Sequence, residues 1–128
     1  MFEIPDTLAM AGAMSSNAAT RLSAIAQNVA NADTPGYQAK DGPVFEDTYT
    51  ADSGLGLVRT RPGHLGSAKG SETIALSARA GGHMSPNGNN VSLEDEMMHA
   101  AQIRQDNDLA LTVYKTSLNI LRASLGRR

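Results

Sequence analysis

The stretch from Asn28 to Tyr37, NVANADTPGY, contains the signals that end a long N-terminal helix. Pro35 disfavours helical geometry in the residue before it, and a Pro35-Gly36 pair favours a type II turn. The side chains of Asn28 and Asn31 can bond the carbonyl groups that the last helical turns leave unpaired. We therefore expect the helix to stop shortly before Pro35 and a tight turn to follow it.

The residues before this turn have the pattern of a helix that is buried on more than one side. It begins near Asp6 or Thr7, either of which can cap it, and runs to about Ala32. Arg21 is its only charged residue after Thr7, whereas a solvated helix normally has a charged outer face. We expect several neighbours to cover it, although small polar residues alone could also keep a weakly specified helix in solution. Its coiled-coil seam, at spacings of three and four, comprises Leu8, Ala11, Ser15, Ala18, Leu22, Ile25, Val29 and Ala32.

A second long helix is expected from Ser92 onward. Ser92 and Asp95 form the S-x-x-D pattern of a helix N-terminus, and the acidic run Glu94–Glu96 places negative charge at the positive end of the helix dipole. Its seam has the same spacing as the first and comprises Met97, Ala100, Arg104, Asn107, Leu111, Tyr114, Leu118, Leu121 and Leu125. A second, shorter stripe comprises Ile103, Ala110, Val113, Ile120 and Ser124.

Two positions of that longer seam are polar, Arg104 and Asn107. A polar residue at a seam position can fix the register and the number of partner helices, at a cost in stability. We therefore interpret this pair as a choice of register or partner.

The segment between the two helices is rich in residues that break regular structure. Ten of the 12 glycines and four of the five prolines lie between Asp33 and Asn90. Short strands in a small β unit, or a loop ordered only against a partner, both fit this composition. We predict a mainly α fold in which the two terminal helices pair as an antiparallel coiled coil. The predicted parts are residues 1–37, with the helix and its turn, 38–90, flexible or small β, and 91–128, the second helix.

The composition disfavours several classes of protein. The chain has 128 residues, enough for one domain, and its net charge of −2 gives no electrostatic reason to expect nucleic acid as a partner. It has no cysteine and no 18-residue apolar run, and its start lacks the pattern of a secretory signal. We therefore expect no disulfide, no membrane span and no cleavable signal peptide. A helix lying on a membrane surface is disfavoured because Arg21 is the first helix's sole cation.

Residues that could carry catalysis or hold a metal are not arranged for either task. His64, His83 and His99 are far apart in the sequence and have no second ligand at helical spacing, which disfavours a zinc site. The acids of Glu94–Glu96 are consecutive, so they point in different directions and suit the helix dipole better than paired acid–base chemistry. No nucleophile elbow or phosphate-binding loop is present. We expect no enzyme activity, no cofactor, no metal and no small-molecule substrate.

NVANADTPGY after a nearly uncharged helix resembles the motif of the flagellar axial proteins of the rod and hook. The C-terminal part from Asn87, NGNNVSLEDEMMHAAQIRQDNDLALTVYKTSLNILRASLG, resembles the closing segment of the rod proteins, and PGHLG at Pro62–Gly66 resembles a short element between them. The small size and the VSLEDEMM helix start point within that family to proximal-rod proteins of the B type. The C type is the nearest alternative, and the Gly-rich stretch through Lys69 has no counterpart that aligns.

The resemblance implies a structural subunit of the bacterial flagellar basal-body rod, the drive shaft that transmits motor torque to the hook and filament. It implies, as partners, other copies of the chain, other rod proteins, and the basal-body base ring or an export-gate adaptor. It also implies type III export without a cleavable signal and a place in the rod where it crosses the periplasm. The rival from another class is a small helical secretion chaperone or adaptor, which would be folded on its own.

We expect the two seams and the turn to form the assembly interface of such a subunit. The expected interface residues are Leu8, Ala11, Ala18, Leu22, Ile25, Asn28, Val29, Asn31, Pro35, Gly36, Tyr37, Met97, Arg104, Asn107, Leu111, Tyr114, Leu118, Leu121 and Leu125.

Overall fold

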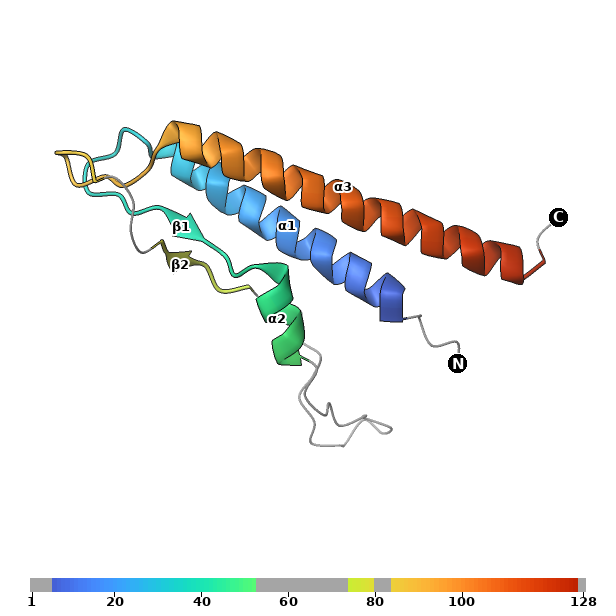
Figure 1. The fold of residues 1–128 in the computed structure, drawn as a ribbon. Coiled ribbons are helices and arrows are strands. Elements are labelled where there is room, and N and C mark those ends of the chain that lie inside the picture. The colour runs from blue at the N-terminus through green and yellow to red at the C-terminus, as the bar shows by residue number, and fades with distance from the viewer. Residues whose placement is uncertain (1–5, 53–73, 80–83, 127–128) are drawn as a thin grey trace.

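The computed structural model describes residues 6–52, 74–79 and 84–126. In chain order the elements are helix α1 (Asp6–Ala30), strand β1 (Lys40–Asp41), helix α2 (Phe45–Asp52), strand β2 (Ser77–Ala78) and helix α3 (Leu93–Ser124). Helices α1 and α3 lie antiparallel along each other, and the short elements lie along one side of this pair (Figure 1). The mainly α fold predicted from the sequence, with two long terminal helices packed together, is confirmed.

The end of α1 follows the signals in the sequence. The helix ends at Ala30, and the Asn31 side chain donates a hydrogen bond to the Gln27 carbonyl at 2.8 Å. The Tyr37 amide then bonds the Thr34 carbonyl, and Gly36 has a φ of 72°. A positive φ at the third residue of such a turn is what a type II turn requires, so the predicted turn is confirmed.

The start of α3 also follows its sequence signal. Ser92 is the N-cap residue, with extended backbone, and its side chain accepts a hydrogen bond from the Asp95 amide. The helix continues for 32 residues to Ser124. The predicted cap is therefore confirmed.

The core between the long helices is small and built from residues of both. Ala18 and Ile25 of α1 form a buried cluster with Ile103 of α3, and Leu22 and Ala100 pack against it. The pairing is antiparallel, since Ser15 donates a hydrogen bond to Asn107 at 2.8 Å whereas Asn28, farther along α1, bonds Glu96, which comes earlier in α3. Most of the expected α1 seam lies at this contact or is buried, but Val29 is 40% exposed. Because alanine has so small a side chain, the two backbones can lie close together.

The side of α3 that packs against α1 agrees only in part with the longer predicted seam, of which Ala100 and Asn107 contact α1. Ile103 and Ala110, which belong to the shorter stripe, are 3% and 1% exposed. The longer seam is divided, with half of it turned away from the helix pair because the buried Glu96–Ile103–Ala110 series sets the rotation of α3. Its half-buried members are Ala100, Asn107, Leu118 and Leu121, and its exposed members are Met97, Arg104, Leu111, Tyr114 and Leu125.

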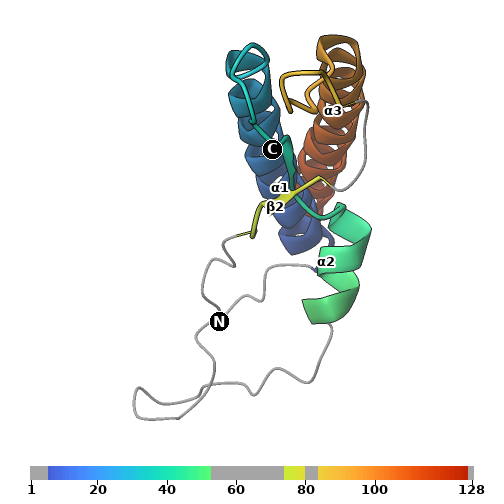
Figure 2. The same ribbon diagram turned by 90° about the vertical axis from the view of Figure 1, so that its left-hand side faces the viewer.

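The middle segment returns along α1 as a small β unit followed by a short helix. Lys40 pairs with Ala78 and Asp41 with Ser77 in a two-stranded antiparallel sheet, which confirms a small β element. Figure 2 shows β2 and α2 beside the helix pair rather than at its ends. Helix α2 was not expected, because the segment that contains Gly42 and Pro43 was predicted to form short strands or a loop. In the structure these two residues lie just before the helix. The resembling element at Pro62–Gly66 lies outside the described residues.

A second side of α1 faces this returning segment. Asn17, Ala24 and Asn28 are buried on that side, and Asn17 donates a hydrogen bond to the Pro43 carbonyl. The expectation that several neighbours cover α1 is confirmed only in part. Helix α1 contacts α3, β1 and α2, but a further side of it remains exposed along Ala9, Gly12, Ala13, Ser16, Ala19, Ser23 and Ala26. In the part of the chain that the structure describes, no helix is both long enough and apolar enough to cross a membrane.

Candidate functional site

The Asn28 amide connects three parts of the chain. Its Nδ2 donates to the Lys40 carbonyl at 2.8 Å and to Glu96 Oε2 at 3.1 Å, and its Oδ1 accepts from the Lys40 amide at 2.8 Å and the Tyr37 hydroxyl at 3.2 Å. These four bonds use the full capacity of a side-chain amide, and Asn28 is 0% exposed. Asn28 therefore ties α1 to the turn, to β1 and to α3.

The predicted role of Asn28 as a cap for the last carbonyls of α1 is wrong. Instead, the Asn28 side chain donates to the Lys40 carbonyl and accepts from the Lys40 amide, so it bonds both backbone groups of this residue of β1. Such a paired arrangement satisfies two buried backbone groups at once.

Glu96 is the second buried group at this place. Its side chain is 0% exposed, and its Oε1 lies 2.7 Å from Arg79 Nη1. Asp41 Oδ2 lies 3.6 Å from Arg79 Nη2, and Asp41 Oδ1 lies 3.4 Å from Arg21 Nε. Arg21, Asp41, Arg79 and Glu96 therefore form a row of charges of alternating sign. A carboxylate taken out of water needs such a partner and further hydrogen bonds.

The interpretation of Glu96 as a residue that only stabilises the helix dipole is incomplete, because Glu96 also bonds Asn28 and Arg79 in the interior. The spacing of the buried residues in α3 indicates this second role. Glu96, Ile103 and Ala110 are spaced by seven residues, so Glu96 continues the stripe of α3 that is buried against α1. A carboxylate on such a buried stripe needs a cation or hydrogen-bond donors beside it in the interior.

The segment Asn87–Asn90 holds the turn that follows α1. Asn89 is 1% exposed, and its Nδ2 lies 2.7 to 2.9 Å from the carbonyls of Asn31, Ala32 and Thr34. The Gly36 amide bonds the Asn87 carbonyl. The carbonyls of the turn that follows α1 are thus bound by a residue far along the chain, a contact that the local sequence pattern did not predict.

Two further observations show how closely the segment after α1 lies against the segment before α3. Asn90 accepts a 2.6 Å hydrogen bond from the Ala39 amide. A Cβ on Gly88, which has a φ of 79°, would lie 3.6 Å from the Cα of Gly36. We refer to the set Asn28, Tyr37, Lys40, Asp41, Arg79, Asn87, Asn89, Asn90 and Glu96 as the asparagine junction.

The expected interface residues fall into three groups in the structure. In the buried group Leu8, Ala11, Ala18 and Ile25 line the helix pair, and Asn28 belongs to the asparagine junction. The half-buried group is Leu22, Asn31, Tyr37, Asn107, Leu118 and Leu121. The exposed group is Val29, Pro35, Gly36, Met97, Arg104, Leu111, Tyr114 and Leu125.

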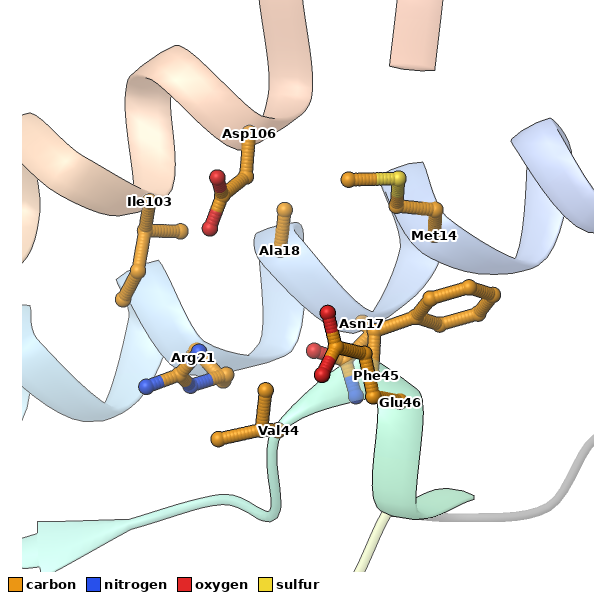
Figure 3. A pocket seen from close by; sticks show the side chains of 9 residues that line it. All are labelled: Met14, Asn17, Ala18, Arg21, Val44, Phe45, Glu46, Ile103 and Asp106. Carbon is orange, nitrogen blue, oxygen red and sulfur yellow. The ribbon is translucent and has the colours of Figure 1, made fainter. Parts of the chain in front are cut away.

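A groove lies between α1, the start of α2 and α3 (Figure 3). Its volume is about 280 Å³, and a smaller hollow of about 240 Å³ adjoins it beside His99. The carboxylates of Asp106 and Glu46 point into the groove from α3 and α2. Its lining residues are Met14, Asn17, Ala18, Arg21, Val44, Phe45, Glu46, Ile103 and Asp106.

The side-chain amides of the asparagine junction are all bonded within the chain. Each amide of Asn28 and Asn89 is committed to backbone or side-chain partners, so neither is available to a ligand. Within residues 6–52, 74–79 and 84–126, no group of three or more His, Cys, Asp or Glu side chains is placed to hold a metal ion. The arrangement fixes the position of α1 relative to α3 and β1.

Comparison with known proteins gives two matches. A family model described as flagella basal body rod protein matches residues 9–38, which cover most of α1 and the turn that the asparagine junction binds. The flagellar basal body rod protein FlgB of Agrobacterium fabrum is 37% identical over 100 residues, which are 75% of this chain and 75% of that protein.

Proposed function

This chain belongs to the flagellar basal body rod protein family, and we propose that it is a structural subunit of the proximal rod, the shaft that carries motor torque to the hook and filament. In this proposal the chain works as a packed element of a helical assembly and not as an enzyme.

The observation that carries the proposal is the outward face of α3. Met97, Leu111 and Tyr114 are 66%, 39% and 37% exposed, and they share a face at helical spacing. Exposed apolar residues grouped in this way are characteristic of a surface that packs against another protein. A subunit that packs side by side with neighbours in a shaft needs such a face in addition to the one that joins its own helices.

The asparagine junction supports the mechanical part of the proposal. A shaft under torque must resist sliding of its helices, and polar contacts with fixed geometry specify one register. Asn28, Asn89 and Glu96 hold the end of α1 against the start of α3 in this way. The buried interface residues then stabilise the subunit, whereas the exposed ones, such as Met97, Arg104 and Leu125, contact its neighbours.

Three further parts of the function follow from family membership as proposals. The partners are other copies of this chain, other rod proteins, and the base ring or an export-gate adaptor. The chain reaches the rod through the flagellar type III apparatus without a cleavable signal and lies where the rod crosses the periplasm. Residues 1–37 and 91–128 form the rod-building unit, and residues 38–90 connect its two halves.

Deletion of the gene in its own bacterium tests this proposal. Cells without the chain are expected to lack rods, hooks and motility, and a plasmid copy is expected to restore all three. The restored chain should be found in purified basal bodies by mass spectrometry. Normal swimming without the chain, or its absence from basal bodies in complemented cells, would contradict the proposal.

The rival roles have different signatures. A C-type rod protein would also be found in basal bodies, but at a different position along the shaft in labelled electron micrographs. A secretion chaperone or adaptor would remain with the export apparatus and be absent from the purified rod. An adaptor would also be fully helical by circular dichroism at micromolar concentration, whereas a rod subunit gains helix as its concentration rises.

A further inference from the structure

The groove between α1, α2 and α3 has apolar walls and an acidic rim, and the one cation among its lining residues, Arg21, is paired with Asp41. Met14, Val44, Phe45 and Ile103 supply the walls. Figure 3 shows the Asp106 and Glu46 carboxylates directed into the space between these walls. Among the described residues Asp106 forms no ion pair or hydrogen bond. The groove therefore fits a segment that combines apolar side chains with positive charge.

The last turns of α3 have that composition. Lys115, Leu118, Arg122 and Leu125 follow one another at spacings of three and four, so they share one face of the helix. Leu125 is 76% exposed, and neither Lys115 nor Arg122 has an ion-pair partner among the described residues. This face, which we refer to as the basic stripe, alternates between a cation and a leucine.

The basic stripe lies away from the groove of its own chain. Ser15 of α1 bonds Asn107 of α3, and equal steps along the two antiparallel helices from that pair bring Asp6, the first residue of α1, opposite Thr116. The turns of α3 that follow therefore extend past the beginning of α1, as Figure 1 shows. A rigid helix cannot bend back, so the stripe reaches a groove only in another molecule.

We propose that the groove of one copy of this chain receives the basic stripe of a second copy, with Arg122 directed to Asp106 and Glu46. The leucines of the stripe then lie against Val44 and Phe45, and Ile103, which is 3% exposed, forms the floor of the groove beneath them. This inference rests on the proposed function, and it names a neighbour and a contact for the subunit.

A contact of this kind is compatible with an open assembly. The groove and the stripe are different surfaces of the same chain, so the contact is head-to-tail rather than two-fold. Repetition of a head-to-tail contact that does not close on itself forms a helical filament. A shaft needs this kind of contact, because each added copy presents a free groove or a free stripe to the next.

Disulfide crosslinking in assembled basal bodies tests the contact. The chain has no cysteine, so a variant with Asp106→Cys and Arg122→Cys carries only the two new thiols. These positions are 16 residues apart on one helix. That spacing is about 24 Å along the axis, too far for a disulfide within one chain. Oxidation of basal bodies is expected to produce covalent dimers and longer ladders of the chain.

Asp108→Cys combined with Arg122→Cys is the matched control. Asp108 is exposed on the same helix but is not a lining residue of the groove. Ladders from the Asp106 pair that exceed those of the Asp108 pair at least tenfold support the contact. Equal ladders from both pairs, or none from the Asp106 pair in rods that contain the chain, overturn it. Absence of the unaltered chain from basal bodies would instead overturn the proposed function.

A charge exchange covers the case in which the cysteine variants do not assemble. Asp106→Lys and Arg122→Glu are each expected to lower incorporation into rods by about tenfold or more, because each places like charges in contact. The variant with both changes is expected to regain incorporation, and Asp108→Lys to keep it. Failure of the combined variant to regain incorporation, with all variants stably produced, overturns the contact.

Discussion

Asn28 of α1 and Glu96 of α3 are 68 residues apart in the sequence, yet the Asn28 amide donates a 3.1 Å hydrogen bond to the Glu96 carboxylate. Both side chains are 0% exposed. Because Asn28 also binds both backbone groups of Lys40, this one contact joins the end of the first helix, the returning strand and the start of the last helix.

The first prediction concerns the loss of Asn28. Asn28→Ala leaves the Lys40 backbone groups and Glu96 without that partner in a buried place, so we expect it to lower the free energy of unfolding by about 2–4 kcal/mol. Urea unfolding followed by circular dichroism measures the change. Asn31→Ala is the control, since its side chain bonds only at the half-exposed end of α1, and we expect a loss of about 0.5–1 kcal/mol. Equal effects of the two variants would contradict the central position of Asn28.

The second prediction compares two ion pairs of the same chain. Arg79 Nη1 lies 2.7 Å from Glu96 Oε1, and the Glu96 side chain is fully buried. Arg21 Nε lies 3.4 Å from Asp41 Oδ1, and the Asp41 side chain is 29% exposed. Arg79→Met strands a buried carboxylate, and we expect it to cost about 3 kcal/mol or more. Asp41→Asn is expected to cost about 1 kcal/mol or less from the loss of its partly exposed pairs.

A double-mutant cycle isolates the Arg79–Glu96 interaction. Adding Glu96→Gln to Arg79→Met removes the stranded charge, so the combined variant is expected to be more stable than Arg79→Met alone. Additive losses in this cycle would show that the two side chains do not act as a pair.

The sequence correctly predicted the features that depend on residues close together in the chain. Ser92 caps α3 as its S-x-x-D pattern indicated, and Pro35-Gly36 forms the predicted turn. Helical spacing also identified the buried side of α1 through Leu8, Ala11, Ala18 and Ile25.

The rest depended on contacts between distant residues. Asn28 bonds Lys40 rather than its own helix end, and Asn89 binds the carbonyls of the turn after α1 from 55 or more residues away. The rotation of α3 is set by Glu96 and Ile103, so the seam richest in large side chains is turned partly outward. No periodicity can distinguish a stripe buried within a subunit from one that a neighbour covers, because both are apolar at the same spacing.

The third prediction uses two glycines of different conformation. Gly36 has a φ of 72°, which side chains rarely adopt, so Gly36→Ala is expected to destabilise the chain by about 1–2 kcal/mol. Gly12 lies within α1 with open space where a Cβ would stand, and Gly12→Ala is expected to stabilise it by about 0.5–1 kcal/mol. Thermal unfolding of the two variants should therefore shift in opposite directions, and shifts of one sign would contradict the turn geometry.

The fourth prediction divides the polar positions of the α3 seam. Asn107 accepts a hydrogen bond from Ser15 inside the subunit, whereas Arg104 is exposed. We expect Asn107→Leu, combined with Ser15→Ala, to strengthen helix pairing while loosening its register, visible as broader amide resonances. Arg104→Leu is expected to leave unfolding unchanged within about 0.5 kcal/mol and to impair rod assembly. Normal motility in an Arg104→Leu strain would show that Arg104 has no part in choosing neighbours.

The decisive measurement is the density of the intact basal body at side-chain resolution. We expect copies of this chain within the rod, each with α1 and α3 antiparallel, Asn28 beside Glu96, and the Met97, Leu111 and Tyr114 face of α3 against a neighbouring subunit. Density in which this chain lies outside the shaft, or in which α1 and α3 are separated and that face of α3 is uncovered, would contradict this expectation.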